Sequence, residues 1–331
     1  MKTGLDGWAK RVSVTAALAV VLSACAPAAA PAPAAPAAPA QKVTLKVGTA
    51  GRSDITAPQA VGVERGFFEK YGLDVKVTEY ASGSAAQEAI LGGSADIIHY
   101  FPPGAASAMA KGAKQKIIAT DQFRPTAWYV MTSSKSNIQS MKDLEGKKLA
   151  ITAKGSTTDY FALWAIQNAK IKAENVPVGF PALYQSVLTG QVDAGIIPPP
   201  LSFQALATGE MRALVDFGKE MPPNLPSVFV ASDDIIAKNP KAVENYVKGF
   251  FDSLQYMKKN REYTVDFLSK FTKQEKAIAE KSYEAIIMTM SDDGIIQKEW
   301  LENSLALGKL GGLTDLPAAE KVWDPNFAKK R

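Results

Sequence analysis

One short pattern occurs twice in this chain, and it limits the folds that the chain can adopt. The segment Leu91–Asp96 has the residues of a helix end, a glycine and an aspartate, and Leu188–Asp193 repeats that order. In both copies, two isoleucines and then at least two prolines follow the aspartate. The aspartates, Asp96 and Asp193, are 97 residues apart. The repetition predicts two similar lobes, each built on a helix–glycine–strand–proline unit.

From Lys42 onward, short apolar segments alternate with segments of helical periodicity, such as Val43–Val47 and then Ala57–Lys70. This alternation is typical of an α/β fold in which each lobe is a mostly parallel sheet flanked by helices. The last third of the chain is helical in pattern, and we expect it to pack back on the first lobe. The chain then crosses between lobes twice, near Gln122–Ala127 and near Ser227–Ala231, which predicts a hinge with a ligand cleft between the lobes. The predicted domains are lobe one, residues 42–122 and 231–331, and lobe two, residues 123–230.

The first 24 residues have the pattern of an export signal. Basic residues precede the apolar segment Val12–Val21, which is too short to span a bilayer comfortably. The next residues, Leu22-Ser23-Ala24-Cys25, resemble the bacterial lipoprotein signal, in which the cysteine becomes a lipidated N-terminus. The sequence therefore predicts a lipoprotein signal peptide over residues 1–24 and lipidation of Cys25. An ordinary secretory signal cut near Ala30, with the cysteine discarded, is the alternative.

Residues 25–41 are predicted to form the lipidated cysteine and a tether. Ala26–Ala40 consists of alanine and proline alone, a composition that favours an extended chain over a helix. At about 3.1 Å per residue, this segment can reach roughly 45 Å. We therefore expect the folded body to lie outside the cytoplasm, held by its lipid anchor on the periplasmic or cell-surface side of a membrane.

Charge and composition argue against several classes of protein. The 331 residues include 38 Lys+Arg and 33 Asp+Glu, a net charge of +5. So small and scattered a surplus is not typical of a protein that binds nucleic acid. One cysteine cannot form a disulfide framework, a zinc cage or an iron–sulfur cluster, and one histidine argues against a histidine-based metal or catalytic site. We expect no catalytic residue, no metal and no cofactor, and a monomeric chain.

Two predicted helix starts have residue types that suit an anion. Ser82-Gly83-Ser84 opens a helix in the first lobe, and Gly155–Thr158 opens one in the second. Unpaired N–H groups and the positive end of the helix dipole attract negative charge. Ordinary capping by serine and threonine explains either start taken alone. Their occurrence at corresponding places in both lobes predicts that both point into one cleft.

Six segments of the chain follow one another in the order in which a known protein family has similar segments. They are Glu64–Val75, Ser82–Ser84, Leu91–Asp96, Asp143–Ala150, Gly155–Thr157 and Gly190–Ala194. Over Lys42 to about Lys270, the chain thereby resembles the solute-binding proteins of ABC importers, in the nitrate/sulfonate/taurine and pyrimidine-precursor group. The resemblance implies a periplasmic-binding-protein type II fold that captures a small, anionic organic solute and delivers it to a membrane permease. Sulfonates, aromatic carboxylates, nitrate and pyrimidine-like compounds are the solutes it suggests. Many members have Glu-Pro after the strand at Ala194–Ile197, where this chain has three prolines.

The helix starts and the resemblance together predict the ligand contacts. Arg52 follows the first strand, where the family places such contacts, and one of Tyr100 and Phe101 is expected to stack on a planar ligand. The full predicted set is Arg52, Ser53, Gly83, Ser84, Ala85, Tyr100, Phe101, Pro102, Trp128, Gly155, Ser156, Thr157, Thr158 and Pro199. For Arg52, Arg124 and His99, the sequence leaves open whether the side chain meets the ligand or has a structural or solvent-exposed role.

Two other functions stay open at this stage. A ligand-sensing surface lipoprotein without a transporter would have the same signals as a transport protein. Enzymes also occur on this fold, among them a pyrimidine-forming enzyme and a menaquinone-pathway lyase. The former has a cysteine-rich motif, whereas the single cysteine of this chain lies at the lipid site.

Overall fold

The structure, a computed structural model, describes residues 42–330. The predicted signal peptide (1–24), the lipidation site Cys25, the tether (25–41) and the last residue lie outside the described part. Among the helices of residues 42–330, none is long and apolar enough to cross a membrane.

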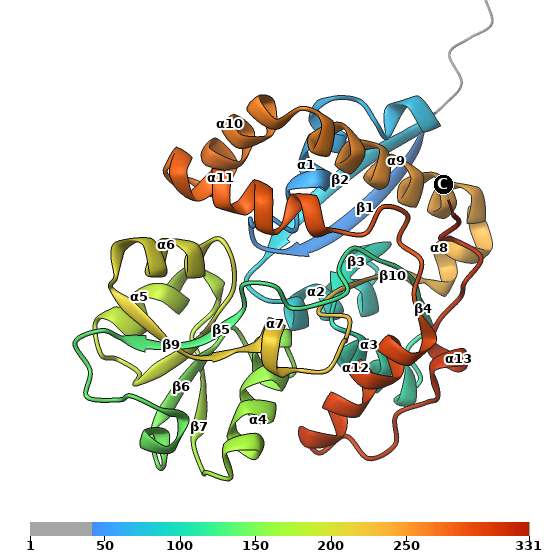
Figure 1. The fold of residues 1–331 in the computed structure, drawn as a ribbon. Coiled ribbons are helices and arrows are strands. Elements are labelled where there is room, and N and C mark those ends of the chain that lie inside the picture. Colours follow the sequence, from blue (N-terminus) through green and yellow to red (C-terminus); the bar gives the residue numbers. More distant parts are fainter. Residues whose placement is uncertain (1–41, 331) are drawn as a thin grey trace, which may run out of the picture. The chain divides into compact units, whose positions relative to one another are not determined.

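The first sheet has five strands in the order β2-β1-β3-β10-β4 (Figure 1). β1 runs parallel to β2 and β3, whereas β10 runs antiparallel to β3 and β4. Strands β3, β10 and β4 are almost entirely buried, so helices must cover both faces there. The strand bounds are β1 Val43–Ala50, β2 Leu73–Tyr80, β3 Ile97–Tyr100, β4 Gln115–Thr120 and β10 Val228–Ser232.

The second sheet repeats this topology in the order β7-β6-β8-β5-β9. β6 runs parallel to β7 and β8, and β5 runs antiparallel to β8 and β9. In both sheets the antiparallel strand has a register shift in its pairing with the neighbouring edge strand, β10 with β4 and β5 with β9. The prediction of two similar lobes with mostly parallel sheets is confirmed. The bounds are β5 Tyr129–Ser133, β6 Lys148–Ile151, β7 Glu174–Pro177, β8 Ala194–Ile197 and β9 Met211–Asp216.

The repeated aspartates have the same structural role in both lobes. The carboxylate of Asp96 accepts a hydrogen bond from the backbone N–H of Lys46 at 2.7 Å, and Asp193 accepts one from Lys148 at 2.9 Å. In each case the backbone N–H of the aspartate donates back to the carbonyl of the same lysine. Each aspartate thereby sets the register between the strand that contains this lysine, β1 or β6, and the strand that follows the aspartate, β3 or β8.

The chain passes between the two sheets twice. The first crossing runs from the end of β4 to the start of β5 and includes the predicted segment Gln122–Ala127. The second crossing was expected near Ser227–Ala231, with lobe two ending at residue 230. That boundary is wrong, because β10 already belongs to the first sheet and pairs there from Val228. The second crossing therefore lies before Val228.

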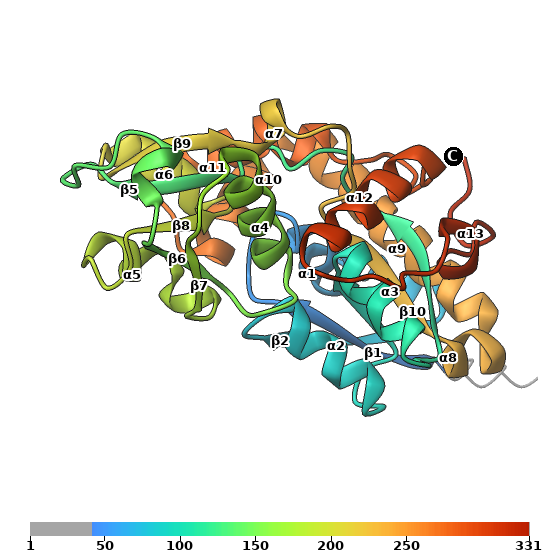
Figure 2. The same cartoon turned by 90° about the horizontal axis from the view of Figure 1, so that it is seen from below.

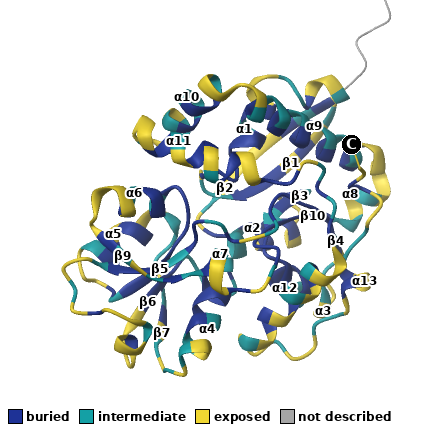
Figure 3. Cartoon of the chain, viewed as in Figure 1, coloured by how far each residue is buried: buried dark blue, intermediate teal, exposed yellow. Residues whose placement is uncertain are grey.

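Helices cover the sheets and join the lobes (Figure 2). The helix bounds are α1 Ala57–Glu64, α2 Gly83–Leu91, α3 Pro102–Ala110, α4 Thr157–Ala169, α5 Leu183–Leu188, α6 Leu201–Thr208, α7 Phe217–Glu220, α8 Asp233–Lys238, α9 Pro240–Lys259, α10 Arg261–Thr272, α11 Lys276–Ala285, α12 Lys298–Leu310 and α13 Ala319–Val322. The C-terminal helices do not pack on the first lobe alone, as was expected. α9 packs on α1, but α11 also packs on α6, and α12 packs on both α3 and α4. Strands β3, β8 and β10 are buried almost throughout, while α10 and α11 expose their outer faces (Figure 3).

The helix predicted over Ala57–Lys70 ends earlier, at Glu64. Gly66 has a φ of +72°, a left-handed conformation that an α-helix cannot contain. The chain turns there and buries the Phe68 ring, which stacks on Tyr246 of α9 at 5.3 Å between ring centroids. The motif that carries much of the family resemblance is thus a turn that docks one aromatic ring under α9.

Two glycines make room for that ring. A Cβ atom at Gly62 would lie 2.5 Å from Phe68 Cε2, and one at Gly249 would lie 2.6 Å from Phe68 Cδ1. Both distances are shorter than packed carbon atoms tolerate. A larger residue at either position would therefore collide with the ring.

We expect Gly249→Ala to destabilise the protein by about 1–3 kcal/mol, because the added methyl group overpacks the Phe68 ring. Urea unfolding followed by circular dichroism measures the change. Gly92→Ala is the control, since Gly92 is exposed and has an ordinary φ of −80°. A Gly249 variant as stable as the Gly92 variant would contradict this packing argument.

Candidate functional site: a pocket between the two sheets

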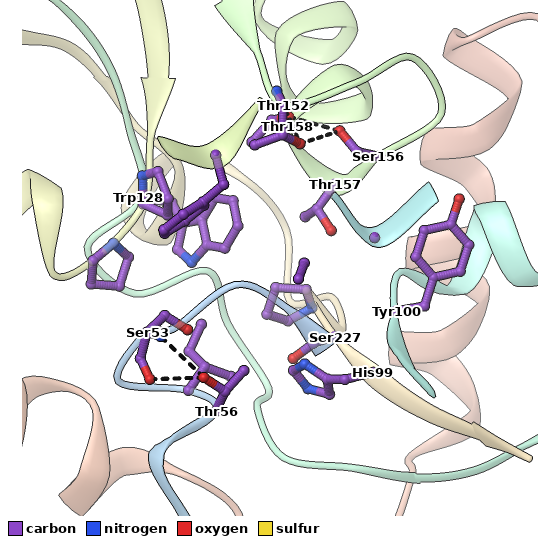
Figure 4. A pocket seen from close by; sticks show the side chains of 17 residues that line it. Ser53, Thr56, His99, Tyr100, Trp128, Thr152, Ser156, Thr157, Thr158 and Ser227 are labelled. Atoms are coloured by element: carbon purple, nitrogen blue, oxygen red, sulfur yellow. Dashed lines mark hydrogen bonds between the residues drawn. The ribbon is translucent and has the colours of Figure 1, made fainter. Parts of the chain in front are cut away.

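A pocket with an empty volume of about 650 Å³ lies between the two lobes. It is bounded by the carboxyl ends of parallel strands from both sheets, the usual position of ligands in open α/β sheets. The lining residues are Ala50, Ser53, Ile55, Thr56, Gly83, His99, Tyr100, Trp128, Thr152, Ser156, Thr157, Thr158, Phe180, Pro198, Pro199, Pro226 and Ser227 (Figure 4).

The structure brings many of the predicted contacts to this pocket and leaves others outside it. Those that line it are Ser53, Gly83, Tyr100, Trp128, Ser156, Thr157, Thr158 and Pro199. Those that do not are Arg52, Ser84, Ala85, Phe101, Pro102 and Gly155. Of the residues left open, His99 lines the pocket, whereas Arg124 is exposed and outside it.

Arg52 is directed elsewhere by two partners that are distant in sequence. Its Nε lies 2.6 Å from Glu79 Oε1, and its guanidinium lies over the Phe271 ring at 5.5 Å. Both residues line a separate hollow between α1, β2 and α10. The expected pairing of Arg52 with an anionic ligand is therefore not the contact that this structure shows.

Ser84 and Gly155, which do not line the pocket, take part in hydrogen bonds between the two lobes instead. The Ser84 hydroxyl donates a hydrogen bond to the carbonyl of Lys154 at 2.8 Å, and the Tyr100 hydroxyl donates to the carbonyl of Gly155 at 2.8 Å. Tyr100 can lie there because Gly83 has no side chain: a Cβ atom would approach the Tyr100 ring to 2.8 Å. These bonds close one side of the pocket.

The remaining excluded residues are structural. Phe101 is fully buried and packs against Tyr160 and Phe161 of α4, with ring centroids 5.4 and 5.7 Å away. Pro102 is the first residue of α3 and is buried with it. The backbone N–H of Ala85 donates to the capping hydroxyl of Ser82. Stacking on a ligand therefore cannot involve Phe101, because other rings already surround it.

The start of α4 leaves few groups free for a ligand. Ser156 caps the helix, and its hydroxyl also bonds to Thr158 at 2.7 Å and to Thr152 at 2.9 Å. The backbone N–H groups of Thr157 and Thr158 come in the first turn, where no helical carbonyl can accept from them. The Thr157 side chain makes no hydrogen bond within residues 42–330, and Figure 4 shows it projecting into the pocket. Thr157, rather than Ser156, has a hydroxyl that projects into the pocket without a hydrogen bond to the described residues.

Trp128 contributes a donor that has no partner in the protein. Its side chain is 8% exposed, and Nε1 is buried without a hydrogen bond to any residue of the described chain. An unpaired buried N–H costs about 1–3 kcal/mol. One edge of the indole packs against Phe161 at 5.3 Å, and the residue also lines the pocket. A ligand atom that accepts this hydrogen bond would remove the cost.

His99 is held by a buried carboxylate behind the pocket wall. His99 Nε2 lies 2.9 Å from Asp121 Oδ2, and the other carboxylate oxygen accepts from the Ser227 hydroxyl at 2.5 Å. Asp121 is fully buried. Because the serine bonds to the aspartate and not to the histidine, the three do not form a nucleophile activated by a base.

Sequence reasoning missed several wall residues, among them Phe180, Pro198, Pro226 and Ser227. Two of them had a readable signal, since Pro198 belongs to the repeated unit and Ser227 to a predicted crossing. Phe180 had none, because only the fold brings it beside Gly51 of the first lobe. In residues 42–330, no group of three or more histidine, cysteine, aspartate and glutamate side chains could hold a metal ion. The arrangement offers donors and flat apolar walls, which suit binding.

A buried carboxyl lies directly behind two wall residues, Ser53 and Ile55. Asp54 is fully buried, and neither of its carboxyl oxygens makes a hydrogen bond within the described chain. Burial raises the pKa of Asp54 to about 7, and the nearby Ser282 hydroxyl offsets only part of that rise. The folded protein therefore keeps a proton there that the unfolded chain loses near pH 4.

We expect the free energy of unfolding to fall as pH rises from about 4 to about 7, with a contribution from Asp54 of at most about 1.4 kcal/mol per pH unit. Above about pH 7 this contribution becomes constant. Asp54→Asn removes the titrating proton, so the difference between variant and wild type should shift in favour of the variant over this range. Urea unfolding at several pH values measures it. Parallel pH profiles of the two proteins would contradict the assignment.

Comparison with known proteins places this geometry in a family. The model of the NMT1/THI5-like family matches residues 56–263, more than half of the chain. A Brucella abortus protein named as a binding protein is 29% identical over 245 residues, covering 72% of this chain and 74% of that protein. An Escherichia coli protein named for binding aliphatic sulfonates is 27% identical over 200 residues, covering 58% and 60%.

Solved structures share the fold. The alkanesulfonate-binding protein SsuA from Xanthomonas axonopodis, bound to MOPS, superposes with a TM-score of 0.75 at 18% identity, covering 86% of this chain and 99% of that one. A desulfurization enzyme, DszB, superposes with a TM-score of 0.60 at 16% identity, covering 86% and 97%. These likenesses concern the fold, while the sequence match assigns the chain: it belongs to the NMT1/THI5-like family.

Proposed function

We propose that this chain is the solute-binding component of an ABC importer, which captures one small organic anion and delivers it to a membrane permease. The main supporting observation is the pocket between the lobes: Trp128 and the first turn of α4 line it, and Trp128 Nε1 has no hydrogen-bond partner within residues 42–330. The sulfonate-binding names of relatives and structural neighbours support the same reading. The chain acts as a monomer, anchored through Cys25 outside the cytoplasm.

Binding without turnover fits the pocket better than catalysis. Its only titratable wall residues are His99 and Tyr100, and each is engaged: His99 with Asp121, and the Tyr100 hydroxyl with Gly155. Burial raises the pKa of Tyr100 further above its usual value, which disfavours its use as a base. The neighbouring desulfurization enzyme shows that this fold can host chemistry, so consumption of the solute would favour an enzyme instead.

The anchor is tested with Cys25→Ser. We expect the variant to leave the membrane fraction, because a serine cannot carry the thioether lipid and no described helix spans a bilayer. Cell fractionation followed by immunoblotting measures it. Uptake of the bound solute should fall in the same cells. A variant that stays in the membrane would contradict lipidation, whereas lost anchoring with undiminished uptake would favour a surface sensor.

The site is tested with Thr157→Asp. The new carboxylate would lie in the pocket at the first turn of α4, so an anionic solute should bind more than about a hundredfold more weakly, because facing like charges cost several kcal/mol. Folding stability should be kept or raised, since an acidic residue suits a helix start. Isothermal titration calorimetry with the solute found by a thermal-shift screen measures the affinity. Thr157→Asn is the matched neutral control, and equal affinities of the two variants would move the anion away from this helix.

A further inference from the structure

The pocket wall lacks full charges. Among the 17 residues that line it there is no lysine, arginine, aspartate or glutamate. Two buried carboxyl groups lie next to wall residues without lining the pocket: Asp121, which accepts from His99 and Ser227, and Asp54, which lies between Ser53 and Ile55 in the sequence. An ammonium group in the pocket would meet no carboxylate in the wall itself, and a doubly charged anion would meet no lysine or arginine there. The wall therefore suits a single negative charge that backbone and hydroxyl donors can share.

The wall is also flat and largely apolar. Trp128, Phe180 and Tyr100 contribute rings, and Pro198, Pro199 and Pro226 contribute the flat faces of three prolines. A small inorganic oxyanion would leave these surfaces uncovered, and it would give up its hydration for few donors. A planar ring would fill the space between them and exclude the water.

Two side-chain nitrogen atoms of pocket residues do not belong to the helix starts. Trp128 Nε1–H is a buried donor that has no partner among residues 42–330. His99 uses Nε2 toward Asp121, and its Nδ1 makes no hydrogen bond within residues 42–330. Because Asp121 fixes the ring, the histidine offers a directed group rather than a mobile one. Figure 4 shows His99 and Thr157 on opposite sides of the pocket.

We infer that the pocket selects an aromatic or heteroaromatic monoanion, whose charged group lies at the first turns of α2 and α4, whose ring lies against Trp128 and Phe180, and whose second polar atom meets His99. This inference rests on the proposed binding function and narrows its solute class. Trp128 and His99 are the specificity-determining side chains, and Asp121 is a positioning residue that acts through His99.

The test is calorimetric titration of the purified protein with 4-hydroxybenzoate, benzoate and nicotinate, against cyclohexanecarboxylate, taurine and nitrate. Cyclohexanecarboxylate has the same charge and size as benzoate but no planar ring. We expect at least one aromatic acid to bind about tenfold or more tightly than any of the other three. Taurine or nitrate binding more tightly than every aromatic acid would overturn the inference and leave the transport proposal standing. Absence of binding by all six would overturn it as well, while the solute screen still judges the transport proposal.

Variants then test the two side chains with the best aromatic acid. Trp128→Phe keeps a ring but removes the N–H, and we expect about tenfold weaker binding. Trp300→Phe is the matched control, because Trp300 lies outside the pocket and packs on Phe123. For Asp121→Asn, we expect hydroxybenzoate to lose more affinity than benzoate, since only the former has a second polar atom for His99. Unchanged affinity in Trp128→Phe, or equal losses for both acids in Asp121→Asn, would overturn the assigned roles.

Discussion

Each sheet of this protein contains one strand that reaches it directly from the other lobe, and the rest of the structure depends on that exchange. β5 follows the first crossing and lies between β8 and β9, whereas β10 follows the second crossing and lies between β3 and β4. Both are antiparallel to their neighbours, and both are almost fully buried. Neither sheet is complete without the crossing that precedes its inserted strand. Both crossings are therefore held at each end by a strand, and three of their residues, Trp128, Pro226 and Ser227, line the pocket.

Much of this fold could be predicted from the sequence, because its signal is local and occurs twice. The aspartate of the repeated unit sets the same strand register in both lobes, so a local pattern that occurs twice predicted the correct symmetry. The strands β5 and β7 were not predicted. β7, Glu174–Pro177, is a short edge strand with polar and proline residues, and such a segment has no apolar period to detect. The packing of α11 and α12 on both lobes is a tertiary contact that no local pattern encodes.

In the candidate site, too, residues placed by local patterns were predictable and residues placed by distant contacts were not. Residues that the backbone places, such as Gly83 and Thr157 at helix starts, were predictable because capping has a sequence signature. Residues placed by distant partners were not. Arg52 is drawn away by Glu79 and Phe271, and Ser84 by a carbonyl of the other lobe. Within the second helix start, the serine that looked like a ligand contact is the cap, and the adjacent threonine faces the pocket.

The bond between Ser227 and Asp121 has a mechanical consequence. Asp121 follows β4 at the beginning of the first crossing, and Ser227 ends the second, so their bond ties the two crossings together at the first lobe; Thr120 reinforces it by donating to the Ser227 carbonyl at 2.8 Å. If the lobes open, both crossings must then bend between this tie and the second lobe. The two bending points together form one hinge axis. His99 belongs to the first lobe, on the same side of that axis as the tie, and Thr157 belongs to the second lobe. The first lobe would meet an arriving solute with its contacts already in place, and would govern how fast it associates. The second lobe would close afterwards and govern how long it stays.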